Sequence, residues 1–148
     1  MHTRDGRRSG FTLLEILVVV LIITILATIV GVNVAKRPGE ARAVAATAQI
    51  HTFKTALQLY RMEQGHYPTQ RQGLQALVER PTSDPIPQVY PEGGYLESRA
   101  VPKDPWGHEF VYMVPGPETL PYEVLSYGAD GQPGGEGENA DISSATLQ

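Results

Sequence analysis

The sequence predicts an α+β fold, in which a long N-terminal helix packs on a small antiparallel sheet. An apolar run without a charged residue covers residues 16–32, and an apolar stripe with helical spacing covers residues 40–63. Two strand-like segments follow at residues 109–114 and 122–127. Most of the 12 Pro and 15 Gly lie after Gly65, so the second half is expected to contain many turns.

Length and composition limit the possible classes of protein. A chain of 148 residues is long enough for one small domain and a membrane helix. The formal net charge is -4, and no basic stripe follows the first residues, so we expect no nucleic-acid partner. The chain contains no Cys, which excludes disulfide bonds. A small outer domain then needs another means of stabilisation, and a bound metal ion is one.

The apolar run predicts a membrane-spanning helix. At about 1.5 Å per residue, the segment from 11 to 35 is about 37 Å long, which is enough to cross a bilayer with some tilt. Its N-terminal flank carries Arg4, Arg7 and Arg8 against Asp5, so we expect a cytoplasmic N-terminus and an exported body. The predicted division is a basic leader (1–10), a membrane helix (11–35) and an outer domain (36–148).

Glu15 is the costly residue of this segment, because an ionised carboxylate in hydrocarbon needs a partner. A partner would be available if the chain were cut between Gly10 and Phe11, which would create an α-amine nearby. A secretory signal peptide and a plain single-pass anchor are the alternatives. Residues 25–27 (ILA) are a poor signal cleavage site, and a plain anchor does not need Glu15.

A second helix is expected after Pro38, which with Gly39 should interrupt the first one. Its alanine-rich start, residues 41–48, could pack against neighbouring helices. Gly65 is a suitable C′ residue, and Pro68 prevents continuation. The apolar stripe that should face the sheet consists of Ala43, Ala46, Ile50, Phe53, Leu57 and Tyr60.

The region after this helix is expected to be mostly irregular. Thr69 is a candidate cap for a short helix over residues 72–79, and residues 82–94 should form a loop. Residues 115–117 should connect the two strands as a hairpin, and Trp106 is expected to pack in the core or beneath the preceding loop.

Residues 128–141 (GADGQPGGEGENAD) form a glycine-rich acidic loop that could surround a cation with oxygen atoms. The spacing does not fit an EF-hand, and an acidic loop without Lys does not fit a phosphate site. Composition alone favours a flexible acidic loop over a metal site. His51, His66 and His108 are scattered, so we expect no zinc site, and no catalytic set is recognisable.

Residues 10–15 (GFTLLE) resemble the processing site of type IV pilins and of the pseudopilins of type II secretion. The resemblance implies that a prepilin peptidase cuts after Gly10 and methylates the new N-terminal Phe11. It also implies that Glu15 pairs with the Phe11 amine of a neighbouring subunit. Such a pairing neutralises two buried charges and fixes the stagger between subunits.

Further blocks resemble the major pseudopilins of type II secretion, in the order found in that family. They are residues 65–69 (GHYPT), residues 72–78 (QGLQALV), residues 96–107, which end in PKDPWG, and residues 126–142, which contain SYGADG and GGEG. The resemblance implies a type IV pilin-like fold with a glycine-rich loop that binds Ca²⁺. Carried over by position, the ligands are the side chains of Asp130 and Asp141 and the carbonyls of Tyr127, Gln132 and Gly135, with Glu136 and Glu138 as weaker candidates.

The function that this resemblance implies is structural, not enzymatic. The chain would be a single-pass inner-membrane protein with a periplasmic C-terminal domain, polymerised into a pseudopilus that drives protein export across the outer membrane. Its expected partners are copies of itself, minor pseudopilins, an inner-membrane assembly platform and the prepilin peptidase. The alternatives are a pilin of a type IV or competence pilus and, in a different class, a membrane-anchored calcium-binding module.

Overall fold

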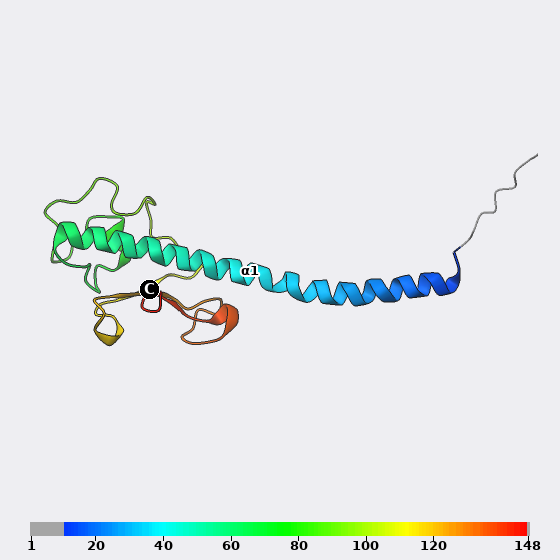
Figure 1. Cartoon of the computed structure of the whole chain (residues 1–148). Helices are drawn as coiled ribbons and strands as arrows, with labels where there is room; N and C mark the ends of the chain where they lie inside the picture. The colour runs from blue at the N-terminus through cyan, green and yellow to red at the C-terminus, as the bar shows by residue number, and fades with distance from the viewer. Residues whose placement is uncertain (1–10, 148) are drawn as a thin grey trace, which may run out of the picture. The chain divides into compact units, whose positions relative to one another are not determined.

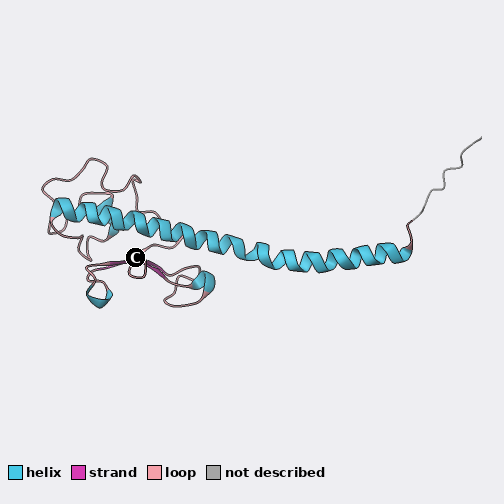
Figure 2. Cartoon of the chain, viewed as in Figure 1, coloured by secondary structure: helices cyan, strands magenta, loops and turns pink. Residues whose placement is uncertain are grey.

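The computed structural model describes residues 11–147, except for the side chains of residues 28–37. The chain forms two compact units, one up to Pro38 and one from Gly39 onward. One long helix, α1 (Leu13–Gln64), is followed by short elements (Figures 1 and 2). These are the 3-10 turns η1 (Leu74–Leu77), η2 (Pro117–Thr119) and η3 (Gly137–Asn139), and the strands β1 (Val111–Met113), β2 (Glu123–Ser126) and β3 (Ile142–Ser143).

The helix α1 runs through Pro38, so the predicted interruption at this residue is wrong. A proline within a helix removes one backbone hydrogen bond and crowds the preceding turn, which can kink a helix without ending it. The domain boundary predicted after residue 35 stays a prediction.

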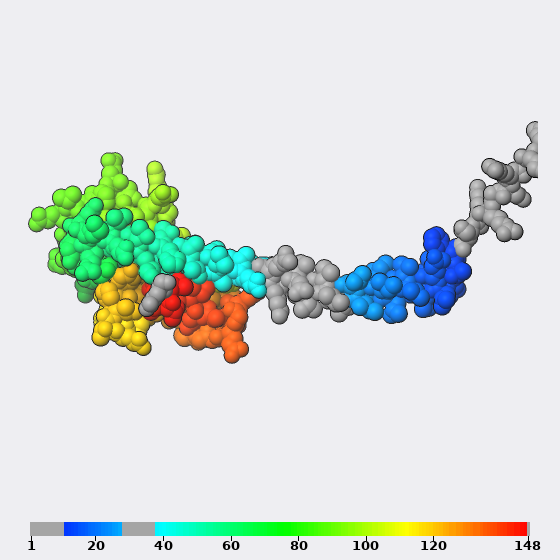
Figure 3. Space-filling model, in the orientation of Figure 1, coloured from blue at the N-terminus to red at the C-terminus, as the bar shows by residue number. Residues whose placement is uncertain are grey.

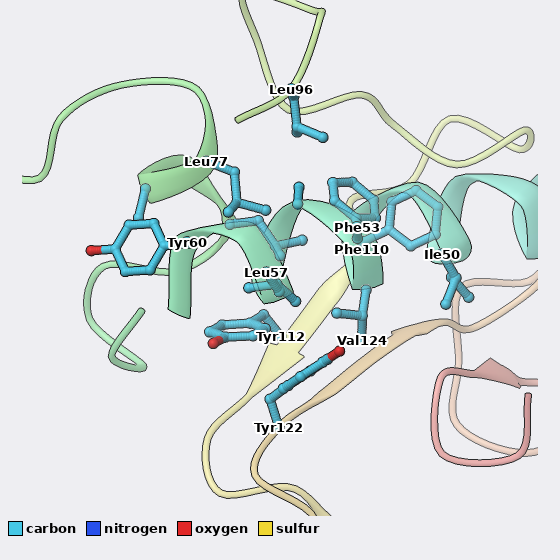
Figure 4. Close-up of a cluster of buried hydrophobic side chains, with 13 residues drawn as sticks. Ile50, Phe53, Leu57, Tyr60, Leu77, Leu96, Phe110, Tyr112, Tyr122 and Val124 are labelled. Carbon is cyan, nitrogen blue, oxygen red and sulfur yellow. The ribbon is translucent and has the colours of Figure 1, made fainter. Parts of the chain in front are cut away.

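The core of the second unit lies between the C-terminal half of α1 and the sheet. The predicted stripe is confirmed, because Ala46, Ile50, Phe53, Leu57 and Tyr60 are at most 1% exposed and only Ala43 is half-buried. Figure 4 shows this face of α1 against side chains of β1 and β2. Across the core, the rings of Phe53 and Phe110 meet edge to face with their centroids 5.0 Å apart. The buried side chains opposite α1 include Phe110, Tyr112, Tyr122 and Val124.

The end of α1 follows from Gly65, as the sequence predicts. Gly65 has a φ of 80°, in the left-handed region that favours glycine. Its N–H donates a 2.8 Å hydrogen bond to the carbonyl of Arg61, which satisfies one of the free carbonyls of the last turn.

The short helix predicted for residues 72–79 is a single 3-10 turn, η1, and Gly73 precedes it without a side-chain cap. Thr69 instead stabilises the turn before η1, because its hydroxyl accepts the N–H of Gln72 at 3.3 Å. Pro81 follows within a few residues and leaves too short a segment to form a helix.

The loop over residues 82–94 contains no helix or strand, as predicted, but two side chains hold it. Gln72 is 7% exposed, and its amide donates to the carbonyls of Ser83 (2.8 Å) and Pro85 (3.0 Å). The guanidinium of Arg80 donates through Nε to the carbonyl of Pro87 at 2.9 Å. The loop is irregular in shape but fixed at its base.

The sheet is antiparallel with the order β1-β2-β3. Residue Tyr112 of β1 faces Val124 of β2, and the predicted hairpin between these strands is confirmed. The strand β3 was not predicted, because two residues carry no recognisable period. Beyond it, Ser144 grips β2 by donating its N–H to the Val124 carbonyl (2.8 Å) and accepting the Val124 N–H at Oγ (2.9 Å). Near the C-terminus, Lys54 Nζ donates to the carbonyl of Leu147 at 2.6 Å.

Candidate functional site

The first candidate site is the start of α1. Thr12 precedes the first helical residue, and its hydroxyl accepts the N–H of Glu15 at 3.2 Å. Thr12 is therefore the N-cap, and Glu15 stands three residues later, at the position that a capping box gives to Glu. The spacing T-x-x-E at residues 12–15 carries this capping signal in the sequence. Gly10, on the other side of the predicted cut, lies outside the described residues.

The Glu15 carboxylate lies in the first helical turn, where the partial positive charge of the helix end favours an anion. The side chains around it are apolar and exposed, with Phe11 at 78%, Leu13 at 84% and Leu14 at 71%. Every described side chain from residue 11 to 27 is exposed. In the part of the chain that the structure describes, no helix has the combination of length and apolar composition needed to cross a membrane.

The second candidate site is the glycine-rich loop, which joins β2 to β3 and lies at the surface (orange in Figures 1 and 3). The loop folds back on itself, since the N–H of Ala129 donates to the carbonyl of Glu138 at 2.9 Å. Gly128 makes this approach possible: its φ is 65°, and a Cβ there would lie 2.7 Å from the same Glu138 carbonyl. Gly135 is similarly enclosed, because its Cβ would lie 2.6 Å from the carbonyl of Asn139.

The two aspartates predicted as ligands both accept hydrogen bonds from backbone N–H groups of this loop. One oxygen of Asp130 accepts the N–H of Gln132 at 3.1 Å, and one oxygen of Asp141 accepts the N–H of Gly134 at 2.9 Å. The bond from Gly134 brings Asp141 back to the glycine segment. Both aspartates are exposed, and each keeps a second carboxylate oxygen that accepts no hydrogen bond from the described residues.

The three predicted carbonyl ligands lie in the same loop. The carbonyls of Tyr127, Gln132 and Gly135 accept no hydrogen bond from any residue that the structure describes. The carboxyl of Glu138 lies instead against α1, where it would collide with a side chain at Gly39. Glu136 is exposed and forms no side-chain hydrogen bond to the described residues.

The donors at this loop are all oxygen atoms, two of them from charged carboxylates. Such a set suits a hard cation such as Ca²⁺, which takes carboxylate, carbonyl and water ligands. Within the described residues, no three His, Cys, Asp or Glu side chains gather in a group that could hold a metal. A cation here would therefore depend on backbone carbonyls as much as on side chains.

Beside the loop lies a polar cluster that was not predicted from the sequence, formed by Asp104, His108, Ser126 and Gly128. We call it the Asp104 bracket. Asp104 is 4% exposed, and one of its oxygens accepts the N–H groups of Trp106 (3.1 Å) and His108 (2.8 Å). The other oxygen accepts the hydroxyl of Ser126 at 2.6 Å. The signal in the sequence was the Asp-Pro-x-Gly turn at residues 104–107, because Asp favours such turns through these backbone bonds.

A Ser, a His and an Asp meet in this bracket, but their geometry is not that of a hydrolase. The hydroxyl of Ser126 donates to Asp104, whereas a nucleophilic serine donates to the histidine. The Nδ1 of His108 lies 3.1 Å from the carbonyl of Gly128 and 3.8 Å from Asp104. Ser126 is also 0% exposed, so no substrate can reach it. The side chains of the cluster bind backbone groups of Trp106, His108 and Gly128.

Comparisons with known proteins agree with this architecture. A family model described as type II secretion system, protein G matches residues 33–145, and a model of the prokaryotic N-terminal methylation motif matches residues 5–31. The type II secretion system core protein G of Pseudomonas aeruginosa is 43% identical over 92% of this chain and 94% of its own length. The core protein G of Vibrio cholerae is 44% identical over 96% of this chain and 94% of its own.

A solved structure shows the same fold. The crystal structure of the major pseudopilin from the type 2 secretion system of enterohaemorrhagic Escherichia coli matches with a TM-score of 0.65 and 34% identity. The match covers 78% of this chain and 96% of that one. It confirms the predicted long helix on a small antiparallel sheet. The chain therefore belongs to the protein G family of type II secretion systems, the family of the major pseudopilins.

Proposed function

We propose that this chain is made with a leader that is cut between Gly10 and Phe11, is methylated at Phe11, and polymerises into a periplasmic pseudopilus. In this proposal the segment from 11 to 35 anchors the subunit in the inner membrane before assembly, with the C-terminal domain in the periplasm. The other components are minor pseudopilins, the inner-membrane platform and the prepilin peptidase. The role is mechanical: the growing filament pushes proteins across the outer membrane.

One observation carries the assembly proposal. A carboxylate stands in the first turn of a helix whose surrounding apolar side chains are exposed. A helix with apolar residues on all sides is not stable in water and needs lipid or other apolar helices around it. In either environment Glu15 needs a positive partner, because an unpaired carboxylate is heavily penalised there.

The cut would supply that partner. It would leave the α-amine of Phe11 one residue before the cap of α1, beside the positive end of the helix, where a cation is unfavourable. The Glu15 carboxylate of a neighbouring subunit would neutralise the charge of the Phe11 amine, and the amine would neutralise the carboxylate. Each subunit then carries one acceptor and one donor for its neighbours, which favours a head-to-tail filament over a closed pair.

The glycine-rich loop is proposed to hold Ca²⁺ through the side chains of Asp130 and Asp141 and through the carbonyls of Tyr127, Gln132 and Gly135. The support is the fit of this donor set, with oxygen atoms only, two negative charges and carbonyls without hydrogen-bond partners. When bound, the ion would cross-link the two ends of the loop, in a domain whose sequence contains no Cys to do so.

The mass of the protein extracted from the membranes of its own host tests the processing step. A chain that begins at Phe11 with one added methyl group is the expected result. A chain that begins at Met1, or one cut beyond Ala27, would contradict it. Assembly is tested separately, by the recovery of sedimentable filaments from cells that express the other secretion components.

A further inference from the structure

We propose that the Asp104 bracket is the positioning device of the calcium loop, and that His108 and Ser126 aim the carbonyl of Tyr127 at the ion without touching it. The inference rests on the calcium site in the proposed function. It adds Asp104 and His108, which lie in a different segment of the sequence from the loop that they support, and Ser126, which directly precedes Tyr127. Partners of metal ligands often matter nearly as much as the ligands, because they fix the orientation of the ligands.

The bracket is anchored by a carboxylate that has no freedom to move. Asp104 is almost fully buried, and its oxygens accept two backbone N–H groups and the Ser126 hydroxyl. Its own N–H donates to the carbonyl of His108 at 2.9 Å, which closes the turn. A buried carboxylate with this many donors is held in one orientation, and so are the groups bonded to it.

Within the bracket, Ser126 and His108 hold Gly128 through both of its peptide groups. Its N–H donates to the Oγ of Ser126 at 3.3 Å, and its carbonyl faces Nδ1 of His108 at 3.1 Å. A carbonyl can only accept, so the histidine tautomer with a proton on Nδ1 is the one that makes this bond. Asp104, whose Oδ2 lies 3.8 Å from Nδ1, favours a proton on that nitrogen.

The bond from Gly128 to Ser126 determines where the Tyr127 carbonyl points. The peptide unit is planar and trans, so its N–H and C=O point in opposite directions. Because the Gly128 N–H is directed at the buried Ser126 hydroxyl, the Tyr127 carbonyl of the same unit is directed away from it. This carbonyl accepts no hydrogen bond from the described residues, which leaves it available as a ligand.

The ring of His108 also supports the next turn of the loop. A Cβ at Gly131 would lie 3.2 Å from Cε1 and Nε2 of His108, so the backbone at Gly131 rests on the imidazole. Ala129 and Asp130 are the two residues between Gly128 and Gly131. The bracket therefore fixes the backbone on both sides of Asp130 as well as the Tyr127 peptide.

The test is calcium titration calorimetry on the full chain in detergent micelles, with CaCl₂ as the only added ligand. We expect His108→Ala to weaken calcium binding about 10-fold or more, which is the usual effect of losing such a partner. His108→Asn should stay close to the unchanged chain, because the Asn amide can donate from the position of Nδ1. The side chain of His108 is 41% exposed, so the Ala variant should fold.

Two further variants separate positioning from general stability. Asp104→Asn replaces one acceptor of the bracket and should also weaken binding. Leu77 belongs to η1 and is buried in the core, so Leu77→Ala should lower the free energy of unfolding without changing the calcium affinity. If the chain binds calcium and His108→Ala binds it equally well, the positioning role is wrong while the calcium site stands. If the unchanged chain binds no calcium, both are wrong, and the filament proposal is untouched.

Discussion

Thr12 and Glu15 are joined by a 3.2 Å hydrogen bond, from the backbone N–H of Glu15 to the hydroxyl of Thr12. The residue that starts α1 and the carboxylate proposed to set the position of neighbouring subunits thus belong to one helical turn. The hydrogen bond therefore connects the residue that caps the helix with the residue proposed to act in assembly.

Glu15→Leu should leave membrane insertion intact and abolish filament formation. The substitution adds an apolar residue to an apolar segment, so insertion becomes more favourable, but the amine of the neighbouring subunit loses its partner. Fractionation of membranes and sedimentation of filaments measure the two steps. Thr12→Ser keeps the capping hydroxyl and is the matched control, with normal assembly expected. Filaments of normal yield from the Glu15 variant would contradict the pairing.

Asp130→Ala should remove the dependence of thermal stability on calcium. A ligand at about 100 times its Kd stabilises a folded protein by about 2.7 kcal/mol, and the variant should lose that increment. The measurement is the melting temperature with CaCl₂ and with a chelator. Glu92→Ala, which removes an exposed carboxylate outside the loop, is the control for a change in charge alone. A calcium-dependent shift that survives in Asp130→Ala would exclude this residue as a ligand.

Gly128→Ala should destabilise the loop more than Gly134→Ala does. Both residues have a positive φ, 65° and 93°, so each substitution carries backbone strain of about 1–2 kcal/mol. Only at Gly128 would the new methyl group meet backbone atoms, at 2.7 to 3.0 Å, whereas nothing lies within 4 Å at Gly134. Protection of loop amides from hydrogen exchange measures the difference. Equal losses of protection in the two variants would show that the backbone at residues 138–140 can move away from Gly128 without an energetic cost.

The stability of the domain should fall between about pH 10 and 12. Burial is the main cause that raises the pKa of Tyr90, Tyr95 and Tyr122 from 10.0 to about 12. In that interval the unfolded chain loses phenolic protons that the folded chain keeps, so unfolding becomes more favourable as the pH rises. Below pH 10 both states are protonated, and this contribution to stability is complete.

The measurement for this prediction is the unfolding midpoint in denaturant against pH, with tyrosinate absorbance followed in parallel. Tyr122→Phe removes one of the contributing groups and should make the fall in stability shallower. Its hydroxyl donates to no described residue, so the loss at neutral pH should be small. An unchanged slope in this variant would show that other groups cause the alkaline unfolding.

Leu57→Ala should lower the free energy of unfolding by about 2–5 kcal/mol, because it leaves a cavity in the centre of the core. Leu57 of α1 is 0% exposed, and its side chain lies on the face of the helix that packs against the sheet (Figure 4). Its neighbour Gln58 is exposed, and Gln58→Ala should stay within about 0.5 kcal/mol. Urea titration of the two variants makes the comparison, and similar losses in both would contradict the packing described for α1.

Periodicity predicted the packing face of α1, because apolar residues such as Ile50, Phe53 and Leu57 recur once per helical turn. It did not predict β3, because this strand consists of only two residues, and the bonds of the following Ser144 to Val124 hold it against β2. The continuity of α1 through Pro38 also could not be read from the residue itself, since proline bends a helix or ends it according to its surroundings.

The glycine-rich loop was recognised from its composition, but its support was not. His108 was dismissed because no other histidine lies near it in the sequence. Its role depends on Gly128, which lies 20 residues away and is brought beside it by the pairing of β1 with β2. Contacts of this kind follow from the fold and have no local signal.

The bond from Lys54 to the Leu147 carbonyl has a practical consequence for anyone who labels this protein. A tag or fluorescent protein fused after Leu147 would leave the domain beside Lys54, in the C-terminal half of α1. There it would compete for space with any subunit that packs along this helix. The turn at Glu92 and Gly93 is exposed, and a side chain at Gly93 would meet nothing within 4 Å, so a small label is better inserted there.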